Sequence, residues 1–237
     1  MKKSVCLLSL LAWASLAPSV SALSEAEKRL DQSATVLSEI MATPDKGIPE
    51  DLLEKAHCIV IVPGMKQAAF IVGGKYGKGY ISCRSKAGSG WSAPGTVRIE
   101  GGSLGFQIGG SETDVILLVL NQSGADKLLS SKFTLGGQGA VAAGPVGRSA
   151  TAQTDAKMRA EILSWSRARG VFAGISLEGA TLRQDLDDNA ELYGQRQENR
   201  QIVTDGIAPP QAAARLLEML NRYSAVEKGK TSEPSNK

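Results

Sequence analysis

Residues 101–120 read GGSLGFQIGGSETDVILLVL and join two glycine pairs to a long apolar run. Glycines this dense are rarely found inside helices, so the stretch predicts paired strands with closely approaching backbones. Apolar residues alternate with small or polar ones over 104–108, which is typical of a strand with one buried face, whereas 115–120 is apolar on both faces. The residue types at 109–112 predict a tight turn. We therefore expect a hairpin that leads into a central, fully buried strand.

The same composition extends on both sides of this stretch, since nineteen of the 26 glycines lie between Gly64 and Gly147. Short apolar segments separated by glycine and proline are typical of strands and turns. This pattern predicts strands at 58–62, 67–72, 79–84, 96–100, 132–135 and 139–143, and we interpret 158–169 and 170–182 as further strands.

Amphipathic patterns flank the glycine-rich region. A capping box at Ser24 begins a helix that continues to about Met41, and a last helix with one apolar stripe is predicted over 209–223. Shorter helices are predicted from Pro49, over 124–130 and, with a surface turn as the alternative, over 185–191. We therefore expect an α+β fold, with a glycine-rich antiparallel β barrel or sandwich over 58–182 flanked by N- and C-terminal amphipathic helices.

The two ends of the chain carry other signals. Lys2 and Lys3 precede an apolar core, and small residues follow at 20–22, which together predict a secretory signal peptide at 1–22. The apolar core is too short to cross a bilayer. We expect cleavage near Ala22 and export to the periplasm or the exterior. Residues 225–237 lack apolar periodicity and are predicted to be a disordered tail.

Charge and cysteine usage limit the function classes. The net charge is +3, and it falls to about +1 without the two lysines of the leader, which argues against nucleic-acid binding. Cys58 and Cys83 remain after cleavage, each in a predicted strand. In an exported chain they form either one disulfide or two buried thiols.

No pattern of catalytic or metal-binding residues accompanies these features. His57 is the only histidine of the sequence, and no cluster of possible metal ligands surrounds it in the sequence. No Gly-x-Ser-x-Gly elbow precedes a helix. The letters at 137–142 and 229–231 match phosphate-binding loops without the strand and helix that such loops require. The acidic run at 185–188 lacks the glycine and glutamate of a calcium loop. We expect a non-enzymatic protein without a metal or a cofactor.

Cations and aromatic rings alternate within the glycine-rich region. Rings beside lysines on short loops suit the boundary between phosphate head groups and acyl chains. A solvated rim on a barrel or sandwich is the alternative interpretation. The set is Lys66, Lys75, Tyr76, Lys78, Tyr80, Arg84, Trp91 and Arg98.

Several ordered motifs resemble one known family. They are IPEDLLEKA at 48–56, FIVGGKYGKG at 70–79, GWSAP at 90–94, GGSLGFQIG at 101–109, TDVILLV at 113–119, AAGPVGR at 142–148 and SWSRARGVFAGISLEG at 164–179. Together they resemble the SYLF domain, which is also described as an actin-binding domain after its fungal members. The resemblance runs from about residue 26 to residue 194.

The resemblance implies a lipid-binding domain over 23–194, followed by a helical extension at 195–224. Eukaryotic members bind phosphoinositide membranes and, in fungi, actin filaments, whereas bacterial members with signal peptides are described as lipid-binding proteins of the envelope. No catalytic residues are implied. We expect binding of anionic phospholipid, and the alternative is an envelope structural or interaction protein that binds another protein or a glycan. The candidate contacts are Lys66, Lys75, Lys78 and Arg148 for phosphate, and Tyr76, Tyr80 and Trp91 for the interface.

Overall fold

The computed structural model describes residues 22–43, 47–85, 90–135, 141–143, 161–168, 171–172, 177 and 179–224, without the side chains of 69–72, 103–109, 141–143 and 171. The predicted signal peptide, the predicted tail and Arg148 lie outside the described residues. The helices are α1 (Glu25–Met41), α2 (Glu50–Lys55), α3 (Gln122–Leu128), α5 (Leu186–Tyr193), α6 (Asn199–Thr204), the 3-10 turn η3 (Gln211–Ala213) and α7 (Ala214–Tyr223). The strands are β1 (Cys58–Cys83), β2 (Gly95–Val119), β3 (Lys132–Thr134), β4 (Val141–Ala143), β5 (Ile162–Ala168), β6 (Val171–Phe172) and β7 (Thr181–Gln184).

One open sheet is built around β2. Strand β1 pairs antiparallel with one edge of β2 along almost its whole length, and the other edge pairs with β7 over 97–100 and with β5 over 114–119. Strand β3 extends the sheet beyond β7, and β4 and β6 pair with β5, β4 in parallel. The predicted α+β class, with a mainly antiparallel sheet and helices at both ends, is confirmed. In the part of the chain that the structure describes, the sheet stays open and does not close into a barrel.

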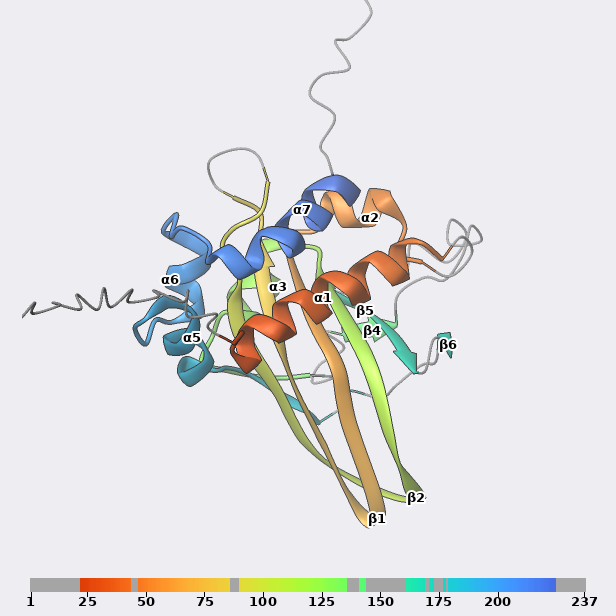
Figure 1. Cartoon of the computed structure of the whole chain (residues 1–237). Helices are drawn as coiled ribbons and strands as arrows, with labels where there is room; N and C mark the ends of the chain where they lie inside the picture. The colour runs from red at the N-terminus through yellow and green to blue at the C-terminus, as the bar shows by residue number, and fades with distance from the viewer. Residues whose placement is uncertain are drawn as a thin grey trace, which may run out of the picture.

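Strands β1 and β2 form a long two-stranded ribbon that bends back on itself (Figure 1). A straight strand of the 26 residues of β1 would measure about 85 Å. The Cα atoms of Cys58 and Cys83, at its two ends, are only 3.9 Å apart, and a disulfide joins these residues. The bend coincides with a register irregularity, because Ala69 pairs with Gly109 whereas Ile71 pairs with Gly105. Residues 70 and 106–108 therefore form the apex of the ribbon.

The tight turn that we predicted at 109–112 is wrong. These four residues continue β2 and pair in order with residues 69, 68, 67 and 66 of β1. The predicted strands at 58–62, 67–72 and 79–84 are likewise one strand, since Pro63 and Gly64 produce only a bulge. The backbone N–H of Gly64 there donates to Asp114 Oδ1 at 2.9 Å. A partner strand of equal length supplies hydrogen bonds on both sides of each glycine pair, so pairing overrides the local turn preference.

Two glycines of β1 allow its outgoing arm (58–69) and its returning arm (71–83) to approach closely. A Cβ atom on Gly79 would lie 2.0 Å from the carbonyl oxygen of Ile61, and one on Gly77 would lie 2.8 Å from Val62 Cγ1. Either distance is too short for any other residue without a shift of the neighbouring atoms. The sequence 77–79 therefore positions the returning arm against the outgoing arm.

The folded ribbon separates two apolar cores by the alternation of its side chains. Residues 115–119 are all fully buried, which confirms the prediction of a central strand buried on both faces. One face packs against α1, α2 and α7 and includes Ile59, Ile61, Ile116, Leu118, Leu163 and Trp165. The other face encloses a second core that includes Val60, Val62, Val97, Ile99, Val115, Leu117, Val119 and Leu182.

Helices α1, α2 and α7 cover the first core, whereas α3 and α6 contribute residues to the second. The helices that we predicted correspond to α1, α2, α3, α5 and α7, and the interpretation of 158–169 as a strand is confirmed over 162–168 by β5. The apolar stripe of α1 is buried at Leu30, Ala34, Leu37 and Ile40. Helix α6 lies within the helical extension expected at 195–224, but no separate helix was predicted at its position. Within the described part of the chain, no helix has the length and hydropathy needed to span a membrane.

Candidate functional site

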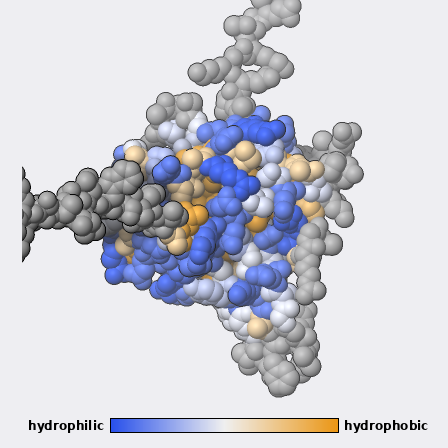
Figure 2. Space-filling model, viewed as in Figure 1, coloured by the Kyte–Doolittle hydropathy of each residue, from blue (hydrophilic) through white to orange (hydrophobic). Residues whose placement is uncertain are grey.

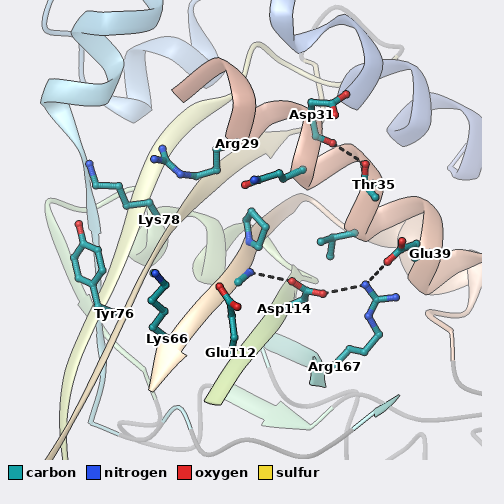
Figure 3. A pocket seen from close by; sticks show the side chains of 15 residues that line it. Arg29, Asp31, Thr35, Glu39, Lys66, Tyr76, Lys78, Glu112, Asp114 and Arg167 are labelled. Atoms are coloured by element: carbon teal, nitrogen blue, oxygen red, sulfur yellow. Dashed lines mark hydrogen bonds and ion pairs between the residues drawn. The ribbon is translucent and has the colours of Figure 1, made fainter. Parts of the chain in front are cut away.

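A groove of about 560 Å³ lies between α1 and the β1–β2 ribbon (Figure 3). Helix α1 forms one wall, the two arms of the ribbon form the floor and the opposite wall, and β5 contributes one residue at an end. The residues that line it are Arg29, Asp31, Gln32, Thr35, Val36, Glu39, Pro63, Gly64, Lys66, Tyr76, Gly77, Lys78, Glu112, Asp114 and Arg167.

Ion pairs neutralise most of the charges that line the groove. Arg167 donates to Asp114 Oδ2 at 3.0 Å and also to Glu39 on α1. Burial alone would lower the pKa of Arg167, but these bonds raise it overall. Asp31, also on α1, pairs with Arg215 of α7 at 2.5 Å. These contacts attach α1 to the sheet and to α7 and leave little net charge free.

Lys66 and Tyr76 are available for contacts from outside. The side chain of Lys66 is exposed, and its register partner across the ribbon is Glu112. Among the described residues, neither Lys66 nor Glu112 takes part in an ion pair. Tyr76 is 48% exposed and, with Leu23, is one of the two large hydrophobic side chains exposed in the described part of the chain. A free cation and an exposed ring therefore share one groove.

The surrounding surface is mainly hydrophilic. On the face shown in Figure 2, hydrophobic residues appear only in separate patches. Single exposed apolar residues are normal on protein surfaces, so the position of Tyr76 beside Lys66 is the informative feature rather than its exposure alone.

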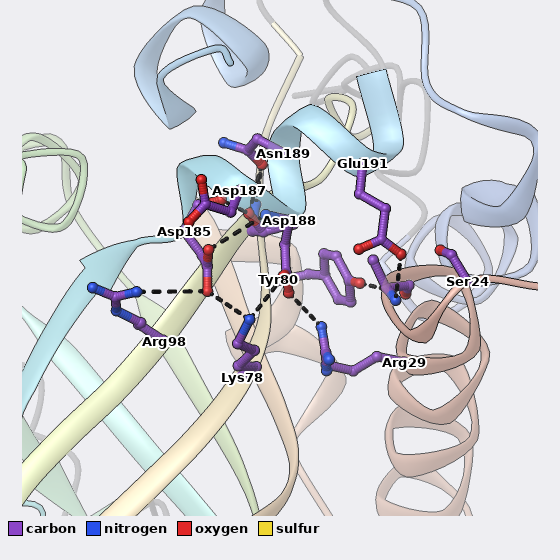
Figure 4. Close-up of polar contacts among 12 residues, drawn as sticks. Ser24, Arg29, Lys78, Tyr80, Arg98, Asp185, Asp187, Asp188, Asn189 and Glu191 are labelled. Carbon is purple, nitrogen blue, oxygen red and sulfur yellow. Dashed lines mark hydrogen bonds and ion pairs between the residues drawn. The ribbon is translucent and has the colours of Figure 1, made fainter. Parts of the chain in front are cut away.

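Lys78 lies at the inner end of the groove and is bound in a network (Figure 4). Its Nζ is 2.9 Å from Asp185 Oδ2 and 2.7 Å from Asp188 Oδ1, and Arg29 reaches the other oxygen of Asp188 at 2.7 Å. Burial opposes the charge of Asp185, yet the bonds from Lys78 and from the backbone N–H of Asp188 hold its pKa below the ordinary value. Burial would likewise lower the pKa of Lys78, but the two carboxylates raise it. Lys78 therefore links β1 to α5.

Tyr80 and Trp91 are buried, at 1% and 7% exposure. The hydroxyl of Tyr80 donates to the carbonyl oxygen of Ala26 at 2.5 Å, and burial raises its pKa. Trp91 Nε1 donates to Ser224 Oγ at 2.8 Å, and the guanidinium of Arg84 stacks over the Trp91 ring at 4.3 Å from its centroid. In this conformation both rings connect elements of the fold and do not reach the surface.

The remaining cations of the predicted set have separate environments. Arg98 pairs with Glu100 at 2.5 Å and lies 3.9 Å from Asp185. Lys75 is half-buried and directly precedes Tyr76 in β1. The structure thus brings Lys66, Tyr76 and Lys78 together at one groove and places Tyr80, Arg84, Trp91 and Arg98 in structural contacts.

Sequence reasoning missed the residues that α1, β2 and β5 contribute to the groove. Arg29, Gln32, Val36 and Glu39 recur at helical spacing, which predicts a second face of α1 but not the strand that it meets. Asp114 and Arg167 are far apart in the chain, and only the pairing of β2 with β5 brings them together.

The groove offers charged and polar groups for reversible binding. Among the described residues, no group of three or more histidine, cysteine, aspartate or glutamate side chains is arranged to hold a metal ion. The side chain of His57 is exposed, and its backbone N–H donates to Val119 O at 2.7 Å. In this arrangement Lys66 can bind an anionic group, and the ring of Tyr76 can lie where polar and apolar surroundings meet.

Comparison with known protein families gives a match over residues 100–223, more than half of the chain, to the family described as "Ysc84: Las17-binding protein actin regulator". The chain belongs to the Ysc84 family. This match confirms the resemblance to the SYLF domain. The segment that matches the Ysc84 family contains three groove residues, namely Glu112, Asp114 and Arg167.

Relatives in the Ysc84 family occur in fungi and animals. "LAS seventeen-binding protein 3" of Saccharomyces cerevisiae is 36% identical over 180 residues, which are 74% of this chain and 39% of that protein. "Protein YSC84" of the same species is 34% identical over 180 residues, 74% of this chain and 38% of that protein. "SH3 domain-containing YSC84-like protein 1" of Rattus norvegicus is 33% identical over 183 residues, 76% of this chain and 53% of that protein. The chain thus spans about half or less of the length of these relatives.

Proposed function

We propose that this member of the Ysc84 family is a non-enzymatic binding protein that contacts anionic phospholipid through the groove between α1 and the β1–β2 ribbon. The observation that carries this proposal is which basic side chains of the groove form ion pairs and which does not. Lys66 is exposed and forms no ion pair with any described residue, and it lies beside the half-exposed ring of Tyr76. The neighbouring arginines and Lys78, in contrast, are bound to carboxylates of the same chain.

The chemistry of Lys66 and Tyr76 suits a membrane surface. A lysine close to an anionic leaflet contributes about 1 kcal/mol, and salt screens this attraction. A tyrosine ring is stable at the level of the head groups, where its apolar body and its hydroxyl meet different surroundings. Lys75, next to Tyr76 in the same strand, supplies a second cation at this level.

We further propose that the protein is exported and acts at a membrane surface of the cell envelope, in the periplasm or outside the cell. The pattern at 1–22 supports export, with cleavage near Ala22. The disulfide between Cys58 and Cys83 also fits this location, because disulfides persist mainly in oxidising compartments.

A protein partner is the second candidate. The family description names binding to Las17 and regulation of actin, and the groove is lined by four acidic residues as well as four basic ones. A surface of mixed charge suits a protein with complementary charges better than it suits a purely anionic ligand. Co-sedimentation with actin filaments, with and without vesicles, tests this candidate directly.

The test of the lipid proposal is flotation with vesicles of phosphatidylcholine and phosphatidylglycerol, using Lys66→Glu and the matched control Lys132→Glu. Lys132 is an exposed lysine of β3 that lies outside the groove. Reversal of one charge changes the interaction by about 2 kcal/mol, so Lys66→Glu should weaken binding roughly thirtyfold at low salt. The control should weaken binding much less. Equal losses for both variants would mean that the groove is not the lipid contact, and no flotation of the unmodified protein would refute lipid binding itself.

A further inference from the structure

The apex of the β1–β2 ribbon extends beyond the rest of the described fold. Between residues 101 and 113, β2 pairs only with β1 among the described strands, because β7 pairs with it up to Glu100 and β5 from Asp114. The ribbon there reaches past every described helix (Figure 1). About six residues separate Gly101 from the apex, so the projection is roughly 20 Å long.

The projecting part of the ribbon has an unusual composition. Residues 67–74 read QAAFIVGG, and residues 101–111 read GGSLGFQIGGS, so neither segment contains a charged residue. Phe70 and Phe106 are two of only four phenylalanines in the chain. The register irregularity places both at the apex, where residue 70 lies opposite 106–108. The point farthest from the core is thus uncharged and rich in apolar residues.

Charged residues return at the same level on both arms of the ribbon. On one arm Lys66 pairs in register with Glu112, and on the other Lys75 pairs with Gly101 and Tyr76 with Glu100. An apolar tip above a collar of lysines and a tyrosine follows the order of a lipid leaflet, in which acyl chains lie beneath phosphates.

We propose that the apex of the ribbon inserts into the lipid leaflet while the collar of Lys66, Lys75 and Tyr76 lies at the level of the phosphates. This inference rests on the proposed function and specifies how the protein contacts the membrane. The outer backbone edges of the projection have no strand partner among the described residues. Unpaired backbone groups are costly in hydrocarbon. The insertion is therefore shallow, about 5–10 Å into the boundary between head groups and acyl chains.

An environment-sensitive label tests the insertion on the full protein. Gln107→Cys, labelled with a nitrobenzoxadiazole dye, places the dye at the apex, and Glu218→Cys places it on the exposed side of α7. Vesicles of phosphatidylcholine and phosphatidylglycerol are the probe, and nitroxides on the acyl chains are the quencher. We expect a blue shift and quenching for the label at 107 and neither change for the label at 218.

The outcomes separate this inference from the proposed function. If the protein floats with the vesicles but the label at 107 does not change, insertion is refuted and lipid contact through the groove remains. If the label at 107 is already shifted without vesicles and the shift grows with protein concentration, the apex binds a second copy and the inference is wrong. If the unmodified protein never floats, both proposals fall.

A substitution provides a second, independent measurement. Phe106→Asp should weaken vesicle binding about tenfold or more at both low and high salt, because it removes apolar contact and adds a charge that must stay hydrated. Lys66→Glu should lose binding mainly at low salt. Far-UV circular dichroism and the intact disulfide show that each variant is folded. A loss for Phe106→Asp that disappears at high salt would contradict insertion.

Discussion

Replacement of Lys78 by methionine distinguishes a structural lysine from a binding lysine. Lys78 is only 25% exposed and holds two carboxylates, of which that of Asp185 is 2% exposed. Methionine keeps most of the length of the side chain but removes the charge. Asp185 and Asp188 would then remain buried with fewer partners, since the described cations left near them are Arg29, 2.7 Å from Asp188, and Arg98, 3.9 Å from Asp185.

The expected loss of stability follows from this burial. Removal of one partner of a fully buried ion pair costs about 3–5 kcal/mol. Because Lys78 is one-quarter exposed, solvent reduces the effect, and we expect a loss of about 2–3 kcal/mol in the free energy of unfolding. The double variant Lys78→Met, Asp185→Asn should recover part of the loss, because asparagine removes the unpaired charge and still caps α5.

Urea unfolding followed by circular dichroism measures this change, with Lys132→Met as the control. Lys132 is exposed, and its replacement should change the free energy of unfolding by less than about 0.5 kcal/mol. The slope of the free energy against urea should stay the same, since the folded structure is unchanged. A loss below about 0.5 kcal/mol for Lys78→Met would refute the structural role, and Lys78 would then become a candidate lipid contact.

The pH dependence of the stability of the same variant checks the directions of the pKa shifts of Asp185 and Lys78. The pKa of Asp185 is lowered in the folded protein, so its contribution is present above the unfolded pKa of about 4 and is lost as the pH falls through the folded value. The pKa of Lys78 is raised, so its contribution is present below about pH 10 and is lost only as the pH rises through the folded value. The stability difference between the unmodified protein and Lys78→Met should therefore be constant near neutral pH and shrink in acid.

Three further predictions concern the ribbon and the groove. Gly79→Ala should destabilise the protein by about 3 kcal/mol or prevent folding, because a Cβ atom there meets backbone at 2.0 Å, whereas Gly74→Ala, with no atom within 4 Å, should be nearly neutral in urea unfolding. Reduction of the disulfide between Cys58 and Cys83, which are 25 residues apart, should lower the free energy of unfolding by roughly 3 kcal/mol, and an unchanged urea midpoint with dithiothreitol would contradict this. Glu112→Gln should strengthen binding to anionic vesicles about fivefold at low salt, and weaker binding would argue for a partner that needs this carboxylate.

Local patterns predicted the parts of the fold that depend on neighbouring residues. The capping box at Ser24 and the apolar stripe that follows it correspond to α1, and its side chains form both predicted hydrogen bonds. The run at 115–119 is buried on both faces because two cores meet at this strand. In both cases the periodicity of one segment contains the information that decides its environment.

The ribbon could not be predicted in this way. Its glycine pairs are typical turn signals, and only the presence of an equally long partner strand keeps them extended. For a similar reason, the residues that the sequence suggested as lipid contacts do not all lie in one exposed site. Tyr76, Lys78 and Tyr80 are every second residue of β1 and therefore lie on the same face of the strand. This face passes beneath α1 and α5, so the exposed fraction of the side chain falls from 48% for Tyr76 to 1% for Tyr80. The sequence shows which residues share a face, whereas the packing of distant helices decides how much of that face is open.

The most direct measurement is the equilibrium binding of the unmodified protein to vesicles of phosphatidylcholine with increasing fractions of phosphatidylglycerol, at low and high salt. The proposed contact predicts binding at least about tenfold tighter to the anionic vesicles at low salt. It also predicts that added salt reduces this preference and leaves a weaker, salt-independent part from the apex. Absence of binding to every vesicle, or equal binding to vesicles with and without the anionic lipid, would contradict the proposed function.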